Sequence, residues 1–123
     1  MKVYRVEHKF TELGPYAGGM GTAGKQILNS SFSNRHPAIW DDLDEETCKK
    51  IDNWKKAFGF ESLEKLERWF TPWEILALFN ENYHIVEVNI DKRNVGIGQA
   101  QVVMNRLKIK SKKPFEYNPK KSA

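Results

Sequence analysis

Two consecutive helix starts constrain the fold of this chain more than any other feature. Ser62 stands where an N-cap precedes a helix that begins at Leu63. Thr71 and Glu74 form a capping box, and Pro72 occupies the first helical position after it. Because these residues satisfy backbone N–H groups that a helix start leaves free, the sequence predicts two short helices in the middle of the chain.

Strand patterns lie on both sides of these helices. Residues 83–90 are rich in β-branched side chains, and residues 95–109 continue as strand with an interruption around Gly96 and Gly98. A short strand ending near Phe60 is expected to lead into the first capped helix. The order predicts an α+β fold with a curved or split, mostly antiparallel sheet and about three helices.

The first strand is predicted over Val3 to Phe10, where apolar and polar residues alternate. One face carries Tyr4, Val6, His8 and Phe10, and the other carries Val3, Arg5, Glu7 and Lys9. This is the period of a half-buried strand, so we expect the second face to meet solvent.

A further amphipathic helix is predicted from Asp44, its N-cap, to Phe58. Apolar residues recur at helical spacing at Cys48, Ile51, Trp54, Ala57 and Phe58, and Leu43 is placed as a hydrophobic staple to Cys48. The acidic run from Asp41 to Glu46 is interpreted as favourable charge at a helix start rather than as a metal site.

Length and composition favour one small domain. A chain of 123 residues can bury a core without disulfides, and we predict one domain over residues 1–110 with a basic, loosely held tail over residues 111–123. The single cysteine, Cys48, fits a reducing compartment. The sequence shows neither a signal peptide nor a membrane-spanning segment, so a cytoplasmic protein without a membrane partner is expected.

A long segment between the first strand and the acidic run, residues 11–40, shows no period and is predicted to be a loop, with a short helix near residues 25–29. Its glycine and lysine spacing over residues 19–25 resembles a phosphate-binding loop, but Gln26 replaces the magnesium-binding Ser or Thr. The favoured interpretation is a flexible glycine-rich loop. The three histidines are too far apart for a local zinc site, and no metal is predicted.

The motifs resemble, in order, a small ADP-ribosyltransferase-like domain. They are an initial Tyr-Arg strand, a Gly-Pro-Tyr loop at residues 14–16, Phe-Gly-Phe-Glu-Ser-Leu-Glu at residues 58–64 before a helix ending Trp-Phe, and Gly-Gln-Ala-Gln-Val-Val at residues 98–103. More loosely, the chain also resembles uncharacterised small bacteriophage proteins.

The resemblance implies a site for NAD. Arg5 or His8 would grip the nucleotide, Gly14 and Tyr16 would belong to the same nucleotide-binding site, and Ser62 would shape the nicotinamide pocket. The catalytic position would fall to Gln101 or Gln99. Glutamine supplies a hydrogen bond but not the negative charge of the family's glutamate. The enzyme hypothesis requires Arg5, Ser62 and Gln101 to converge in one cleft.

A non-catalytic alternative is a phage-type binding protein or inhibitor that acts on a host protein or nucleic acid in the host cytoplasm. Aromatic residues of the long loop, Tyr16, Phe32 and Trp40, would anchor a protein partner. Nucleic-acid contact is predicted through Lys108 to Lys121, where lysines surround Phe115 and Tyr117.

Overall fold

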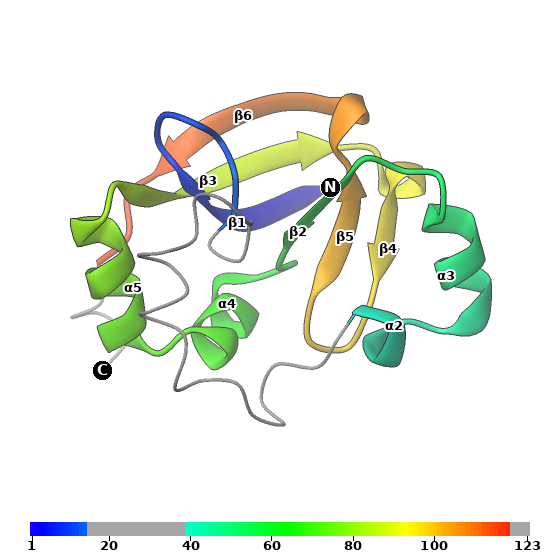
Figure 1. The fold of residues 1–123 in the computed structure, drawn as a ribbon, viewed down its shortest axis with the longest axis horizontal. Helices are drawn as coiled ribbons and strands as arrows, with labels where there is room; N and C mark the ends of the chain where they lie inside the picture. The colour runs from blue at the N-terminus through cyan, green and yellow to red at the C-terminus, as the bar shows by residue number, and fades with distance from the viewer. Residues whose placement is uncertain (15–38, 119–123) are drawn as a thin grey trace.

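The computed structural model describes residues 1–14 and 39–118, which form two three-stranded antiparallel sheets with helices at their sides (Figure 1). Sheet A has the order β1 (Lys2–His8), β3 (Tyr83–Ile90) and β6 (Ile109–Phe115). Sheet B has the order β2 (Lys56–Gly59), β5 (Val102–Asn105) and β4 (Val95–Ile97). The predicted α+β class and the split antiparallel arrangement are confirmed.

The helices are short. They are α2 (Ile39–Asp42), α3 (Glu45–Ile51), α4 (Leu63–Trp69) and α5 (Pro72–Asn80), with the 3₁₀ turns η2 (Lys92–Asn94) and η3 (Arg106–Lys108) between strands. In the described part of the chain no helix is long and apolar enough to cross a bilayer.

The predicted caps of α4 and α5 are confirmed. Ser62 Oγ accepts a hydrogen bond from the backbone N–H of Lys65 at 3.2 Å. Thr71 Oγ1 accepts from Glu74 N at 3.2 Å, and Glu74 accepts in return from Thr71 N at 2.8 Å. The side chain of each capping residue therefore replaces water as the partner of a free helix N–H.

Three apolar cores hold the layers together. One face of sheet A packs against α4 and α5 through Val6, Phe60, Leu66, Trp69, Phe70, Ile75, Leu78, Tyr83 and Ile85. Its other face packs against sheet B through Val3, Ala57, Val86, Val88, Ile90, Val95, Val102 and Met104. Helix α3 covers the far face of sheet B through Leu43, Ile51 and Val103. Each fully buried aliphatic side chain contributes about 1.5 to 3 kcal/mol.

The two sheets meet where β1 passes β2. Tyr4 and Phe60 exchange two backbone hydrogen bonds, of 2.8 and 2.7 Å, in an isolated bridge. A Cβ atom at Gly59 would lie 2.6 Å from Val3 Cγ1 and 2.8 Å from the carbonyl oxygen of Tyr4. Only glycine permits this approach, which accounts for the Phe-Gly-Phe sequence at the junction.

The helix predicted from Asp44 to Phe58 is too long. Asp44 does cap α3, and its carboxylate accepts from Thr47 N at 2.7 Å, but the helix ends at Ile51. Ala57 and Phe58 belong to β2 instead. Their apolar side chains fit either period, and pairing with β5 decides between them.

The chain after Lys110 was expected to be loosely held, and for residues 111–115 this prediction is wrong. These residues continue β6, which pairs with β3 from Ile109↔Ile90 to Phe115↔Ile85. Hydrogen bonding to a central strand compensates for the low apolar content of this segment.

The predicted burial of the first strand is also wrong, because the face expected to meet solvent is buried at Val3, Arg5 and Glu7, whereas Phe10 on the other face is exposed. The strand is also shorter than expected and ends at His8. Of the expected loop over residues 11–40, residues 15–38 lie outside the described residues. Residues 11–14 form neither helix nor strand, and Ile39 and Trp40 belong to α2. The glycine-rich segment at residues 19–25 lies outside them too.

Candidate functional site

Basic residues gather at one end of sheet B. Three segments meet there. They are residues 49–56, from the last turn of α3 to the start of β2, residues 91–94 around η2, and residues 105–110 around η3. They hold Lys49, Lys50, Lys55, Lys56, Lys92, Arg93, Arg106, Lys108 and Lys110, and their acidic residues are Asp52 and Asp91. The whole chain has a formal net charge of only +4, so the rest of it is net acidic. We call this region the basic end.

Two contacts show that these connections adjoin one another. Arg106 N donates to the carbonyl oxygen of Lys55 at 2.7 Å, and Lys110 Nζ lies 3.1 Å from a carboxylate oxygen of Asp91. The yellow and orange turns of Figure 1 are η2 and η3, on the side of the molecule where α3 packs.

A groove crosses the basic end between α3 and β4. It has a volume of about 440 Å³ and is lined by Thr47, Lys50, Lys92, Arg93, Val95, Gly96 and Ile97. Three cationic side chains and one hydroxyl thus surround a wide, open depression. Such a lining suits an anionic group that brings several acceptor oxygens.

The cations of this groove are weakly neutralised. Arg93 lies 3.6 Å from Asp91, whose carboxylate is shared with Lys110. The hydrogen bond from Lys110 lowers the pKa of Asp91 below its ordinary value. Lys50 Nζ stands 5.7 Å from the centre of the Trp54 ring. Lys92 forms no ion pair with any residue in the described part of the chain.

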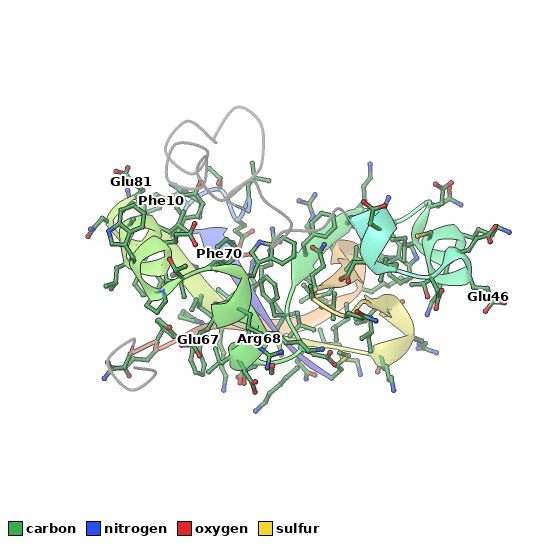
Figure 2. The ribbon with its side chains drawn as sticks, turned by 90° about the horizontal axis from the view of Figure 1, so that it is seen from below. Phe10, Glu46, Glu67, Arg68, Phe70 and Glu81 are labelled. Atoms are coloured by element: carbon green, nitrogen blue, oxygen red, sulfur yellow. The ribbon has the colours of Figure 1, made fainter. Side chains whose placement is uncertain are left out.

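The acidic excess outside the basic end comes from the run at α2 and the start of α3, which holds Asp41, Asp42, Asp44, Glu45 and Glu46. Figure 2 shows Glu81 and Phe10 beside α5 at one end of the long axis, and Glu46 beside α3 at the other. On α4, Lys65 and Arg68 are paired with Glu61 and Glu64 one turn earlier. These two cations are therefore already paired with carboxylates of α4 and of the residue before its N-cap.

A second charged cluster links β1 and β6, the two outer strands of sheet A, and its centre is buried. Arg5 Nε donates to Glu7 Oε2 at 3.1 Å, and Arg5 Nη1 donates to the carbonyl oxygen of Phe58 at 2.9 Å. Lys112 Nζ is 2.7 Å from Glu7 and 3.0 Å from Glu12. We call these four side chains, Arg5, Glu7, Glu12 and Lys112, the buried cluster, after its two buried members Arg5 and Glu7; Lys112 and Glu12 reach the surface.

The charges of the buried cluster balance one another. Burial lowers the pKa of Arg5 from its ordinary value, although Glu7 opposes that shift. Burial also works against the charge of Lys112, but its hydrogen bonds to Glu7 and Glu12 outweigh burial and raise its pKa above 10.5. Two cations and two carboxylates thus hold β1, β6 and the chain after β1 together.

The predicted nucleotide-binding residues of β1 and the turn after it already have partners. Arg5 donates hydrogen bonds to Glu7 and to the carbonyl oxygen of Phe58, as described. Gly14 lies against the Arg5 side chain, since a Cβ atom at Gly14 would lie 3.6 Å from Arg5 Nη2. His8 Nδ1 accepts from Phe10 N at 3.2 Å. Its ring also makes edge contacts with Phe10 and Tyr83. Tyr16 lies outside the described residues, as does the loop residue Phe32.

The other predicted site residues are also engaged. The Ser62 hydroxyl caps α4, and the backbone N–H groups of Gln99 and Gln101 donate to Asp42 at 3.0 Å. Gln101 is buried directly before β5, the central strand of sheet B, in which Val102 pairs with Gly59. The contacts among described residues do not join Arg5, Ser62 and Gln101, and NAD binding and ADP-ribosyl transfer stay predictions.

The tail lysines divide into two groups. Lys112 belongs to the buried cluster, and Lys113 pairs with Glu87 at 3.2 Å, whereas Lys108 and Lys110 reach the basic end. Lys120 and Lys121 lie outside the described residues. The cations from α3 and η2 were not singled out by the sequence, since the Asp-Lys-Arg-Asn segment at residues 91–94 signalled only a turn.

Comparison with known proteins agrees with the phage resemblance. Residues 1–118 match the family model described as bacteriophage T4 Y00F protein. No curated protein and no solved structure shows significant similarity to the chain. These comparisons give no support to the ADP-ribosyltransferase resemblance. The match spans nearly the whole sequence, and the chain therefore belongs to the bacteriophage T4 Y00F protein family.

Proposed function

We propose that this phage protein is a non-catalytic binding protein that holds the phosphate backbone of a nucleic acid at its basic end. The observation that carries the proposal is the groove lined by Lys50, Lys92 and Arg93, with Thr47 beside them. Phosphate oxygens accept hydrogen bonds from these donors, and the protein's cations release the counterions condensed around the phosphates.

The charge distribution supports a polyanion rather than a single small anion. Cations extend beyond the groove to Lys55, Arg106 and Lys108, which are exposed and form no ion pair with a described residue. A surface that follows several connections can contact consecutive phosphates. The same concentration of one sign of charge accelerates encounter with a polyanion.

The experiment is a titration of fluorescently labelled single-stranded and duplex 30-mers, followed by anisotropy at several salt concentrations. We compare the wild type with the triple variant Lys50→Gln, Lys92→Gln and Arg93→Gln. At low salt the triple variant is expected to bind at least about tenfold more weakly, and its salt dependence is expected to fall by about two to three units of slope.

A matched control removes the same charge elsewhere. The variant Lys9→Gln, Lys65→Gln and Arg68→Gln also loses three cations, but from the turn after β1 and from α4, which do not line the groove. Binding by this control should stay close to that of the wild type. If both triple variants lose affinity equally, net charge rather than the groove explains binding. If the wild type binds neither probe at low salt, the proposal is wrong and a protein partner becomes the hypothesis to test.

NAD binding, which the first resemblance predicts, is tested on the same material. Calorimetric titration of the wild type with NAD gives a heat of binding if a nucleotide site exists, and Arg5→Ala and Ser62→Ala then test the predicted contacts. Because both side chains have structural partners, each variant is first compared with the wild type by thermal unfolding. A wild type without binding heat removes NAD from consideration.

A further inference from the structure

The turn between β4 and β5 holds a carboxylate with its backbone. The N–H group of Gln99 donates to Asp42 Oδ1 at 3.0 Å, and that of Gln101 donates to Oδ2 at 3.0 Å. The N–H group of Ala100 lies between them and is 3.1 Å from both oxygens. Three consecutive amides thus point at one anion that comes from a distant part of the chain.

The turn is shaped for this anion. The N–H of Gly98 closes it by donating to the carbonyl oxygen of Gln101 at 2.9 Å. A Cβ atom at Gly98 would overlap the carboxylate of Asp42 and would also lie 3.0 Å from the Gln101 oxygen. A side chain at this position would fill the space that the anion takes. Consecutive N–H groups around such a space form an anion-binding concavity, often called a nest.

We propose that the backbone of residues 98–101 is a binding site for a phosphate group and that Asp42 occupies it as an internal ligand. Phosphate, like the carboxylate, presents acceptor oxygens on one central atom, although tetrahedrally, and it carries more negative charge. Asp42 is only partly buried and Gln99 is exposed, so a phosphate can reach the turn from solvent. We call this site the turn site.

The turn site is distinct from the groove of the basic end. The groove reaches β4 only as far as Ile97, and none of the residues that contact the Asp42 carboxylate lines it. This proposal therefore stands or falls independently of nucleic-acid binding at the basic end.

The Asp42 carboxylate competes strongly with free phosphate for the turn site, because it belongs to the same chain. A tethered group has an effective concentration in the millimolar range or higher, so free phosphate must reach comparable levels before it displaces the carboxylate. Removing the carboxylate should expose the affinity of the turn itself. This expectation separates a binding site from a turn that merely fastens α2 to sheet B.

The experiment is a titration with inorganic phosphate at constant ionic strength, followed by the ¹⁵N–¹H amide signals of Gln99, Ala100 and Gln101. In Asp42→Ala these signals are expected to shift and saturate at a phosphate concentration at least tenfold below that needed in the wild type. Asp41→Ala, which removes a neighbouring exposed carboxylate, should behave like the wild type. The double variant Asp42→Ala, Gly98→Ala should not respond, because the added methyl group fills the site.

Two results would overturn the proposal. One is an Asp42→Ala protein that remains folded but whose three amides do not respond to phosphate. The other is an equal response in the double variant, which would show that phosphate binds elsewhere. If Asp42→Ala does not fold, Asp42→Asn carries the same test, because its amide oxygen still accepts hydrogen bonds but lacks the charge that opposes phosphate.

Discussion

The buried cluster and the basic end use the same kinds of side chain in opposite ways. In the buried cluster, Arg5 and Lys112 face Glu7 and Glu12, and each of these charges has a partner of opposite sign. The basic end holds nine basic residues and two acidic ones, and Lys49 has a further partner in Glu45, one turn earlier in α3. The first arrangement holds three parts of the chain together, and the second leaves donors directed at solvent.

This difference teaches where to look for function in a chain without a catalytic motif. A buried charge costs free energy unless it is paired, so a closed cluster such as that of Arg5 has a structural explanation. Exposed like charges repel one another and add little stability, so a fold has no need to gather them in one place. The basic end is the region that folding does not explain.

The largest expected effect is on the buried cluster. Glu7→Gln leaves Arg5 buried without its counter-charge, and we expect the free energy of unfolding to fall by about 3 kcal/mol. Urea denaturation at pH 7 measures it. The control Glu12→Gln removes an exposed carboxylate of the same cluster and should cost less than about 1 kcal/mol. A loss below about 1 kcal/mol for Glu7→Gln would show that the cluster is not a structural unit.

Substituting two nearby lysines of β6 allows a direct comparison of the buried cluster with the basic end. Lys112→Gln removes the cation between Glu7 and Glu12 and should lower stability by about 1 to 2 kcal/mol. Lys110→Gln removes an exposed partner of Asp91 at the basic end and should change stability by less than about 0.5 kcal/mol. Thermal and urea unfolding of both variants give the ranking. Equal losses would erase the distinction between the two regions.

Ser62 tests whether a polar residue predicted to bind a nucleotide serves the fold instead. Ser62→Ala removes the cap of α4 and is expected to cost about 1 kcal/mol. Ser62→Asp keeps a capping oxygen and should retain most of the stability. The measurement is the urea midpoint of each variant. If the alanine variant is as stable as the wild type, the cap does not stabilise the fold, and ligand binding again becomes the hypothesis for Ser62.

The smallest expected effect concerns Glu87, which is paired with cations of both neighbouring strands. Hydrogen bonds from Lys113 and then Lys2, with their charges, lower the pKa of Glu87 below 4.5. A lowered pKa favours folding above the ordinary carboxyl pKa, and this contribution disappears as the pH falls through the lowered value. The stability difference between the wild type and Glu87→Gln should therefore be present at pH 7 and vanish near pH 2. Unfolding of both proteins at several pH values checks the sign, and a difference that grows in acid would contradict it.

Local signals in the sequence predicted the middle of the fold well. The caps at Ser62 and Thr71 lie where expected, and β3 has the predicted bounds of Tyr83 and Ile90. Capping depends on residues three positions apart, and a buried central strand needs a continuous run of β-branched and aromatic residues. Both signals are complete within a few residues.

Strands whose pairing comes from far along the chain were harder to predict. The segment of β6 is lysine-rich and contains a proline, and only its partner β3 makes it a strand. Ala57 and Phe58 fit a helical period in the sequence, but in the fold they belong to β2, because this segment pairs with β5. The candidate site was predicted in part: Lys108 was named for nucleic-acid contact, but Lys50, Lys92 and Arg93 are separated in sequence and meet only in the folded groove.

The sequence by itself determined the α+β class, the two capped helices, the central strand and the net positive charge, because each depends on neighbouring residues or on composition alone. The tertiary structure decided which charges are satisfied. The sequence pattern predicted that Arg5 and Glu7 face solvent, but in the fold Lys112 of β6 lies beside Glu7. The sequence pattern assigned Asp42 to the charge at a helix start, but in the fold it accepts hydrogen bonds from three backbone amides of residues 98–101. The reason is physical: the free energy of a charge depends on its burial and on partners within a few ångströms, and both are set by contacts between distant parts of the chain.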